Sequence, residues 1–216
     1  MSDRLGARPA ADEPTTGNGD WRRDERRGWT TRDSLLVAVL GVIFAFLYMQ
    51  WIPVWLAARA FGAQVGQEAL FGFWLTAGVL AAYIVRRPGA ALIGEFLAAF
   101  AQVLIGAPAG APLLITGIMQ GIGAELVFAS RGYRDWRLRT LLVAGIVTAL
   151  IALPWNWFRL GYFALEPAFL AVLLVVRIVS GAFWAGLVPK ILGDLLARTG
   201  VLSGYAIGRQ REQPRV

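Results

Sequence analysis

The chain has 216 residues, of which 57% are hydrophobic and 16% are charged, and its formal net charge at pH 7 is +7. Soluble domains are nearer to about 45–50% apolar and roughly a quarter charged, so the composition argues against an ordinary globular enzyme and favours a protein with several membrane spans. Cysteine and histidine are both absent, which excludes disulfides, Cys- or His-based zinc sites, thiol nucleophiles and histidine general bases.

Residues 1–33 are polar, rich in Arg, Asp, Gly, Pro and Thr, and show no apolar periodicity. This composition predicts a disordered cytoplasmic N-terminal tail. It lacks the apolar stretch and small-residue cleavage site of a signal peptide. We expect the membrane domain to occupy residues 34–208, followed by a basic C-terminal tail over residues 209–216.

Six apolar runs follow the tail, each close to the roughly 20 residues that cross a bilayer as a helix. A proline lies just after the first, fifth and sixth runs, where we expect those helices to end. The pattern predicts an all-α membrane protein with six transmembrane helices. The runs are Ser34–Trp51, Leu70–Val85, Ala90–Ala107, Leu113–Ser130, Thr140–Leu153 and Pro167–Val188.

The basic residues predict the orientation of these spans. All of them except Arg59, Arg159 and Arg177 fall in the N-terminal tail, in the loops that follow the second and fourth runs, or in the segment from Pro189 onward. Because cytoplasmic loops carry the excess of Lys and Arg, we expect both termini to be cytoplasmic. The cations form short clusters between apolar runs and no basic stripe, so we expect no nucleic-acid partner and a lipid bilayer instead.

The two long loops on the opposite side, residues 53–69 and 154–166, are rich in aromatic residues and glycine. Aromatic residues gather at membrane interfaces, so these loops fit an aromatic belt. They equally fit a lid over a pocket, because ligand-contacting residues concentrate on loops that a rigid scaffold holds. Both interpretations remain open from the sequence.

Three charged residues, Glu95, Glu125 and Arg177, fall inside the predicted spans, where a charge is costly and indicates function or a buried partner. The helical rise places the two glutamates at one depth and Arg177 somewhat further out. One interpretation is a structural ion network between Arg177 and these carboxylates, which we favour for Glu125. The other makes a carboxylate the floor of a ligand cavity, and Glu95 fits either.

A second polar set lies toward the outer face. Gln102 follows Glu95 by two helical turns, so both face the same way. An aromatic wall with a few amides and carboxylates suits a flat, partly cationic heterocycle, although interfacial anchoring and hydrogen bonds between helices are the simpler alternatives. The candidate ligand-binding residues are Glu68, Trp74, Glu95, Gln102, Gln120, Asn156 and Tyr162.

Several motifs are dispersed along the chain in a characteristic order. They are Tyr83–Leu92, Glu95, Gly106–Gly110, Gln120–Glu125, Arg177–Ala182 and Thr199–Leu202. Together they resemble, in the same order, the YkoE-type specificity subunits (S components) of energy-coupling factor (ECF) transporters. The resemblance covers about residues 34–208 and leaves the N-terminal tail unmatched.

The resemblance implies a six-helix plasma-membrane subunit that binds thiamine or its hydroxymethylpyrimidine precursor and performs no catalysis. It also implies a transmembrane coupling subunit and two cytosolic ATPases, or a fused pair, as partners. Lys190, the one lysine, lies in no Walker A motif.

The chain departs from the family's pattern at Gln102, where members carry a carboxylate. Glu68, six residues before Trp74, matches a family spacing and is therefore the expected outer carboxylate. Two alternative functions remain. The chain is an S component for another small vitamin or heterocycle, or it is a membrane assembly subunit that does not transport.

Overall fold

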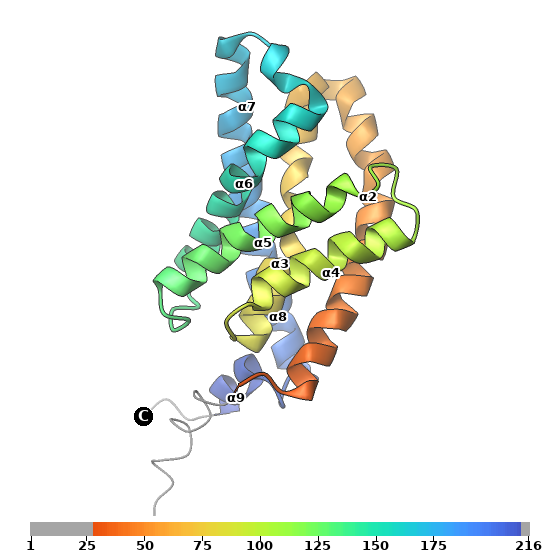
Figure 1. The fold of residues 1–216 in the computed structure, drawn as a ribbon. Coiled ribbons are helices and arrows are strands. Elements are labelled where there is room, and N and C mark those ends of the chain that lie inside the picture. The colour runs from red at the N-terminus through yellow and green to blue at the C-terminus, as the bar shows by residue number, and fades with distance from the viewer. Residues whose placement is uncertain (1–27, 213–216) are drawn as a thin grey trace, which may run out of the picture.

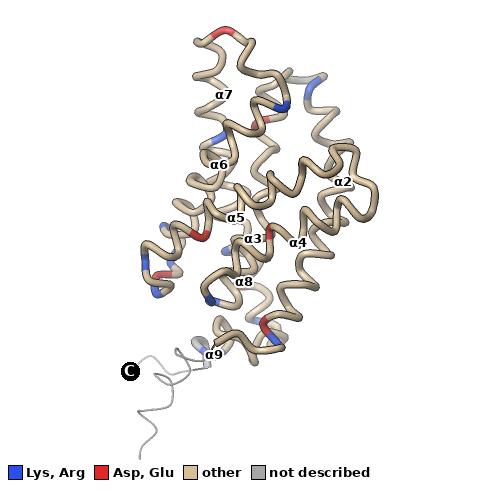
Figure 2. Tube along the Cα trace, in the orientation of Figure 1, with Lys and Arg blue, Asp and Glu red and all other residues tan. Residues whose placement is uncertain are grey.

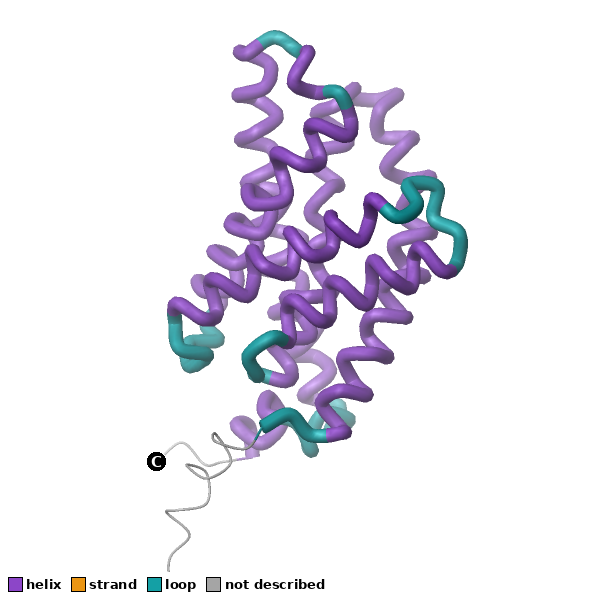
Figure 3. Tube along the Cα trace, in the orientation of Figure 1, coloured by secondary structure: helices purple, strands orange, loops and turns teal. Residues whose placement is uncertain are grey.

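The computed structural model describes residues 28–212, and within them every regular element is helical (Figures 1 and 3). Most of the expected N-terminal tail lies outside the described residues, but its last three residues, 31–33, already belong to the first helix. The elements in chain order are α2 (Thr31–Phe71), η1 (Gly72–Leu75), α3 (Thr76–Val85), α4 (Ala90–Leu104), α5 (Pro112–Ser130), α6 (Leu138–Leu160), η2 (Tyr162–Ala164), α7 (Pro167–Ser180), η3 (Gly181–Leu187), α8 (Val188–Arg198) and α9 (Ala206–Glu212).

Five helical segments are long and apolar enough to cross a membrane, and α4 is a sixth, shorter apolar helix. The predicted six-span, all-α architecture is therefore confirmed. All ten residues of α3 are buried, so this helix runs through the centre of the bundle and the other spans pack around it. The start of α2 and helix α9 lie at the same end of the molecule (Figure 1).

The prolines predicted to end three spans do not end them. Pro53 lies inside the first span, which continues to Ala60, and Pro154 lies inside α6, which continues to Leu160. Pro189 lies in the first turn of α8, and the sixth span continues through it to Arg198. Membrane helices tolerate proline because neighbouring groups satisfy the backbone that it frees. The two predicted outer loops are consequently almost entirely helical.

Helix α2 has a well-defined beginning and an internal break. Thr30 and Asp33 form a capping box, in which each side chain accepts the other residue's backbone N–H at 3.1 Å. The break follows Ala60, where Ala63 adopts a left-handed backbone conformation with φ 48°. Here the chain reverses direction and the second span begins at Gly62, eight residues before the sequence pattern placed it.

The second span is irregular where it passes the middle of the bundle. The 3-10 turn η1 separates α2 from α3, and side chains from other helices accept the backbone N–H groups around it. Gly72 donates to Ser180 Oγ at 2.9 Å, and Ala77 donates to the Tyr48 hydroxyl at 2.9 Å. Such substitution by side chains allows a helix to break inside a membrane.

The sixth span has a matching irregularity, the π-helical segment η3, which packs against η1 and α6. Thr76 Oγ1 donates to the carbonyl of Trp184 at 3.1 Å and links the two irregular segments. On the other side, a Cβ atom at Gly145 would lie only 2.2 Å from the carbonyl oxygen of Gly181. Glycine at position 145 is therefore needed for the close approach of α6 and η3.

A candidate ligand-binding cavity

A cavity of about 270 Å³ lies between α2, η1, α4, α5 and α6, and the loop between α4 and α5 closes one side. Its walls are mainly apolar with a small number of polar side chains, which is typical of small-molecule sites. The lining residues are Tyr48, Ile52, Trp55, Leu56, Phe71, Trp74, Glu95, Ala99, Gln102, Ala107, Pro108, Ala109, Leu113, Thr116, Gln120, Asn156, Arg159 and Leu160.

Aromatic side chains form the wall contributed by the first two spans. Trp55 meets Trp74 edge to face, with ring centroids 5.8 Å apart, and Trp74 packs against Phe71 with centroids 6.0 Å apart. The indole of Trp55 is fixed by a 3.1 Å hydrogen bond to the carbonyl of Gln67. These rings offer flat faces and edges to a heterocyclic ligand.

Glu95 is the only acidic side chain among the cavity-lining residues, and it is almost fully buried. The backbone N–H of Gly78 donates to Glu95 Oε2 at 2.6 Å, and the Tyr48 hydroxyl lies 3.5 Å from Glu95 Oε1. Both partners are neutral, and no ion pair joins Glu95 to another described residue. Its carboxyl group is therefore held in place by hydrogen bonds alone.

Three amide side chains also line the cavity. Gln102 lines it together with Glu95, as their spacing on one helix face predicted. Asn156 is fixed by a 2.8 Å hydrogen bond to the carbonyl of Ala152, whereas Gln120 Nε2 is buried and has no partner in the part of the chain that the structure describes. Five of the seven candidate residues, namely Trp74, Glu95, Gln102, Gln120 and Asn156, thus line one cavity.

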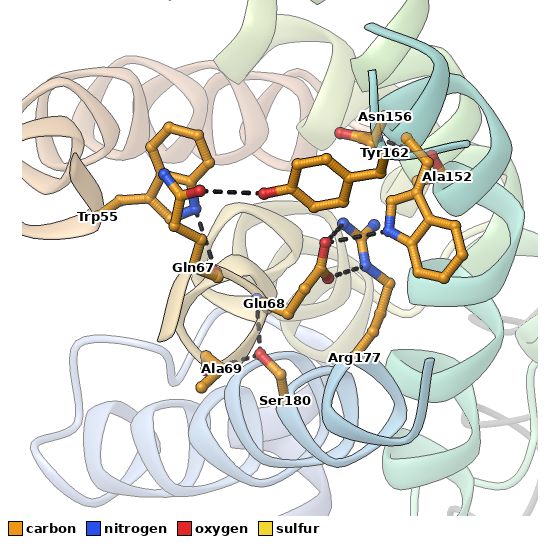
Figure 4. A network of polar contacts seen from close by, with 11 residues as sticks. Trp55, Gln67, Glu68, Ala69, Ala152, Asn156, Tyr162, Arg177 and Ser180 are labelled. Atoms are coloured by element: carbon orange, nitrogen blue, oxygen red, sulfur yellow. Dashed lines mark hydrogen bonds and ion pairs between the residues drawn. The ribbon is translucent and has the colours of Figure 1, made fainter. Parts of the chain in front are cut away.

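The other two candidates, Glu68 and Tyr162, do not line the cavity. Glu68 forms a buried ion pair with Arg177, including a 3.0 Å hydrogen bond from Arg177 Nη2, and it accepts a further 3.0 Å bond from Trp157 (Figure 4). Glu68 thus pairs with Arg177 and lies outside the cavity lining, which differs from the position at the ligand that the sequence led us to expect. The ion pair lies behind the aromatic wall, with the Arg177 guanidinium 3.7 Å from the Phe71 ring centroid.

Tyr162 supports the wall from the same side. Its hydroxyl donates to Gln67 Oε1 at 3.0 Å, and the Gln67 backbone in turn holds Trp55 (Figure 4). Burial, followed by the nearby charge of Glu68, raises the pKa of Tyr162 to about 12, so the hydroxyl remains a donor at neutral pH. Tyr162 therefore positions a lining residue and does not itself face the cavity.

Glu125 also differs from its predicted role. Its carboxylate accepts the backbone N–H groups of Gly89, Ala91 and Leu92, at the start of α4, together with the Tyr133 hydroxyl at 2.7 Å. Burial and the adjacent carboxylate raise the pKa of Tyr133. The predicted network of Arg177 with Glu125 or Glu95 is wrong, because Arg177 pairs with Glu68 and Glu125 caps a helix.

The predicted site residues did not include several that line the cavity, among them Tyr48, Trp55, Phe71 and Arg159. Tyr48 and Trp55 are seven residues apart and share a helix face, but the predicted helix end near Pro53 separated them. Phe71 lies one turn before Trp74. Arg159 was assigned to a loop, whereas it belongs to the last turn of α6.

A bundle of six apolar spans, five of which line a small, aromatic-walled cavity, defines a solute-binding membrane protein. Three similarities identify the class more closely. The family model described as the permease component of an ABC-type cobalt transport system matches residues 32–151. The putative HMP/thiamine permease protein YkoE of Bacillus subtilis (strain 168) is 34% identical over 189 residues, which cover 88% of this chain and 95% of the relative.

A crystal structure of an S component of an ECF transporter superposes with a TM-score of 0.82 at 34% identity, covering 86% of this chain and 94% of that one. The chain therefore belongs to this family of transport-system permease components. It is a multi-pass plasma-membrane protein. Its role is that of the substrate-binding subunit of an ECF-type importer, which is a transport subunit.

Proposed function

We propose that this subunit binds hydroxymethylpyrimidine or thiamine in the cavity between α2, α4, α5 and α6. The observation that carries the proposal is the combination of an aromatic wall with one buried carboxyl group, Glu95, which has no ion-pair partner among the described residues. An aminopyrimidine ring is flat and carries both N–H donors and ring-nitrogen acceptors. Its donors fit the carboxylate of Glu95 and its faces fit the indoles of Trp55 and Trp74.

The name of the Bacillus subtilis relative supports the same ligand, since that protein is a putative HMP/thiamine permease. In thiamine, the thiazolium ring adds a positive charge, and cations bind favourably over aromatic faces. The amides of Gln102, Gln120 and Asn156 can serve either ligand because each amide offers both a donor and an acceptor.

A cobalt ion, which the family description mentions, is a poorer match to this cavity. Divalent cobalt is held by several nitrogen, oxygen or sulfur ligands, of which imidazole and thiolate are the strongest. Glu95 is the single acidic lining residue, and the sequence contains neither histidine nor cysteine. Within residues 28–212, no group of three or more acidic side chains lies close enough together to hold a metal.

The same proposal includes the orientation and the partners. Most basic residues of the described chain lie at the end of the bundle that carries α9 (Figure 2). By the positive-inside rule we infer that this end is cytoplasmic. Both termini then lie inside the cell, and the connection from the end of α6 to the start of α7 lies outside. A transmembrane coupling subunit and two ATPase subunits, or a fused pair, would complete the importer.

Ligand binding to the purified protein tests this function. We expect saturable binding of hydroxymethylpyrimidine and of thiamine in calorimetry, with quenching of tryptophan fluorescence by the nearby rings. Replacing Glu95 by Gln should weaken binding about 10- to 100-fold, because a hydrogen bond to a charged group contributes about 1.5–3 kcal/mol.

Glu166→Gln is the matched control, because Glu166 is an exposed carboxylate that does not line the cavity. Its affinity for both compounds should equal that of the unmodified protein. Cobalt(II) added in excess should neither bind in the cavity nor displace the pyrimidine. Absence of binding by both organic compounds would refute the proposed function.

A further inference from the structure

Arg159 is a cationic side chain on the cavity wall, in the last turn of α6. Its Nη1 atom is buried and has no hydrogen-bond acceptor among residues 28–212. No acidic side chain of residues 28–212 forms an ion pair with it. A buried N–H of a charged group that lacks an acceptor costs free energy unless another molecule supplies one.

The comparison with Arg177 shows why Arg159 is unusual. Arg177 is more deeply buried and also has one nitrogen, Nη1, without a hydrogen bond. Its charge is nevertheless neutralised by Glu68, and its guanidinium packs on the ring of Phe71. Arg177 is therefore accounted for within the protein, whereas the charge of Arg159 faces a cavity and is compensated by no carboxylate.

The cavity walls consequently differ in the polar groups that they offer. The α4 wall presents the carboxylate of Glu95, which is an acceptor. The α5 and α6 walls present two donors without partners, Gln120 Nε2 and Arg159 Nη1. A matching ligand carries donors on the side facing α4 and an electronegative substituent on the side facing α5 and α6.

We propose that Arg159 is a specificity-determining residue that donates to an oxygen substituent on the bound heterocycle. The oxygen belongs to a hydroxyl group or to a phosphate ester, since both accept hydrogen bonds from a guanidinium. This inference rests on the proposed function, which assigns a pyrimidine ring to the cavity. It goes further by naming the substituent on that ring that the protein selects.

Three probes separate the possibilities in calorimetry with the purified full chain. They are 4-amino-5-hydroxymethyl-2-methylpyrimidine, its phosphate monoester, and 4-amino-2,5-dimethylpyrimidine, which lacks the oxygen. We expect the unmodified protein to bind an oxygen-bearing probe about 10- to 100-fold more tightly than the dimethyl compound. Preference for the alcohol identifies the hydroxyl as the selected group, and preference for the ester identifies the phosphate.

The variant Arg159→Gln should remove most of that preference while leaving the affinity for the dimethyl compound within about threefold. Arg159→Lys, which keeps the charge but not the planar fork, should restore part of it. Arg59→Gln is the control, because Arg59 is an exposed cation near the same end of the bundle that does not line the cavity. It should bind all three probes normally.

Equal affinity of the unmodified protein for all three probes would overturn the inference, and this measurement needs no variant to fold. An Arg159→Gln protein that keeps the full preference would overturn it as well. Failure of every pyrimidine to bind would instead refute the proposed function, so the two failures are distinguishable.

Discussion

Buried carboxylates in this protein differ in what compensates their charge. Glu68 faces the guanidinium of Arg177, so the pair is neutral and belongs to the packing of the bundle. Glu95 is equally buried but accepts hydrogen bonds only from the backbone of Gly78 and the hydroxyl of Tyr48. A ligand with N–H donors or positive charge gains more from Glu95 than from Glu68, which is why we assign recognition to Glu95.

The variant Glu68→Gln tests this division of roles. It leaves the Arg177 guanidinium buried without an opposite charge, and breaking one side of a buried pair costs about 3–5 kcal/mol. We expect a clearly lower unfolding temperature in detergent, with pyrimidine affinity in the folded protein within about threefold of normal. An unchanged melting temperature combined with lost binding would show that Glu68 faces the ligand after all.

Three of the five predicted lining residues, Glu95, Gln102 and Gln120, could be found in the sequence because apolar spans make polar side chains conspicuous. Glu95 and Gln102 were also placed on one face by their spacing. The partner of Arg177 could not be predicted, because depth was counted from presumed helix ends. The second span starts eight residues earlier than its hydropathy suggests, which brings Glu68 inside the bundle and level with Arg177.

At the scale of helices, two irregular segments lie side by side next to the cavity. The 3-10 turn η1 carries Trp74, a lining residue, and the π-helical segment η3 packs directly against it. Neither irregularity was predictable, since each depends on partners from a distant span: Ser180 accepts from Gly72, and Thr76 donates to Trp184. Hydropathy gives the number of spans, whereas the breaks arise from contacts between them.

The start of helix α4 is capped by a carboxylate from a different helix. The Glu125 side chain, on α5, accepts three N–H groups from the first turn of α4. Backbone donors at a helix start have no partner within the helix, and a negative charge there is favourable. Because α4 carries Glu95 and Gln102, this contact fixes the position of one cavity wall.

Replacing Glu125 by Gln should therefore destabilise the protein without affecting recognition directly. We expect a loss of about 1–3 kcal/mol in the free energy of unfolding, which corresponds to about 2–4 °C in melting temperature per kcal/mol for a chain of this size. Faster amide exchange at the start of α4 should accompany it. Normal stability together with a 10-fold loss of pyrimidine affinity would contradict the capping role.

At the scale of the whole molecule, the chain contains a binding cavity but no nucleotide-binding motif. Its single lysine, Lys190, contacts Asp194 one turn away on α8, and no glycine-rich phosphate loop surrounds it. Tenfold accumulation of a solute against its gradient requires about 1.4 kcal/mol. Binding alone cannot supply this energy repeatedly, so a separate source must drive release on the inner side.

Reconstitution in lipid vesicles tests this requirement. The subunit alone should bind labelled hydroxymethylpyrimidine up to one equivalent per protein, with no ATP-dependent increase. Addition of a coupling subunit and its ATPases should produce accumulation above the external concentration, and this accumulation should disappear with a non-hydrolysable ATP analogue. The Glu95→Gln subunit in the same assembly is the control, because it retains the docking surfaces but should require about 10- to 100-fold more ligand for equal uptake. Accumulation by the subunit alone would mean that another gradient drives transport.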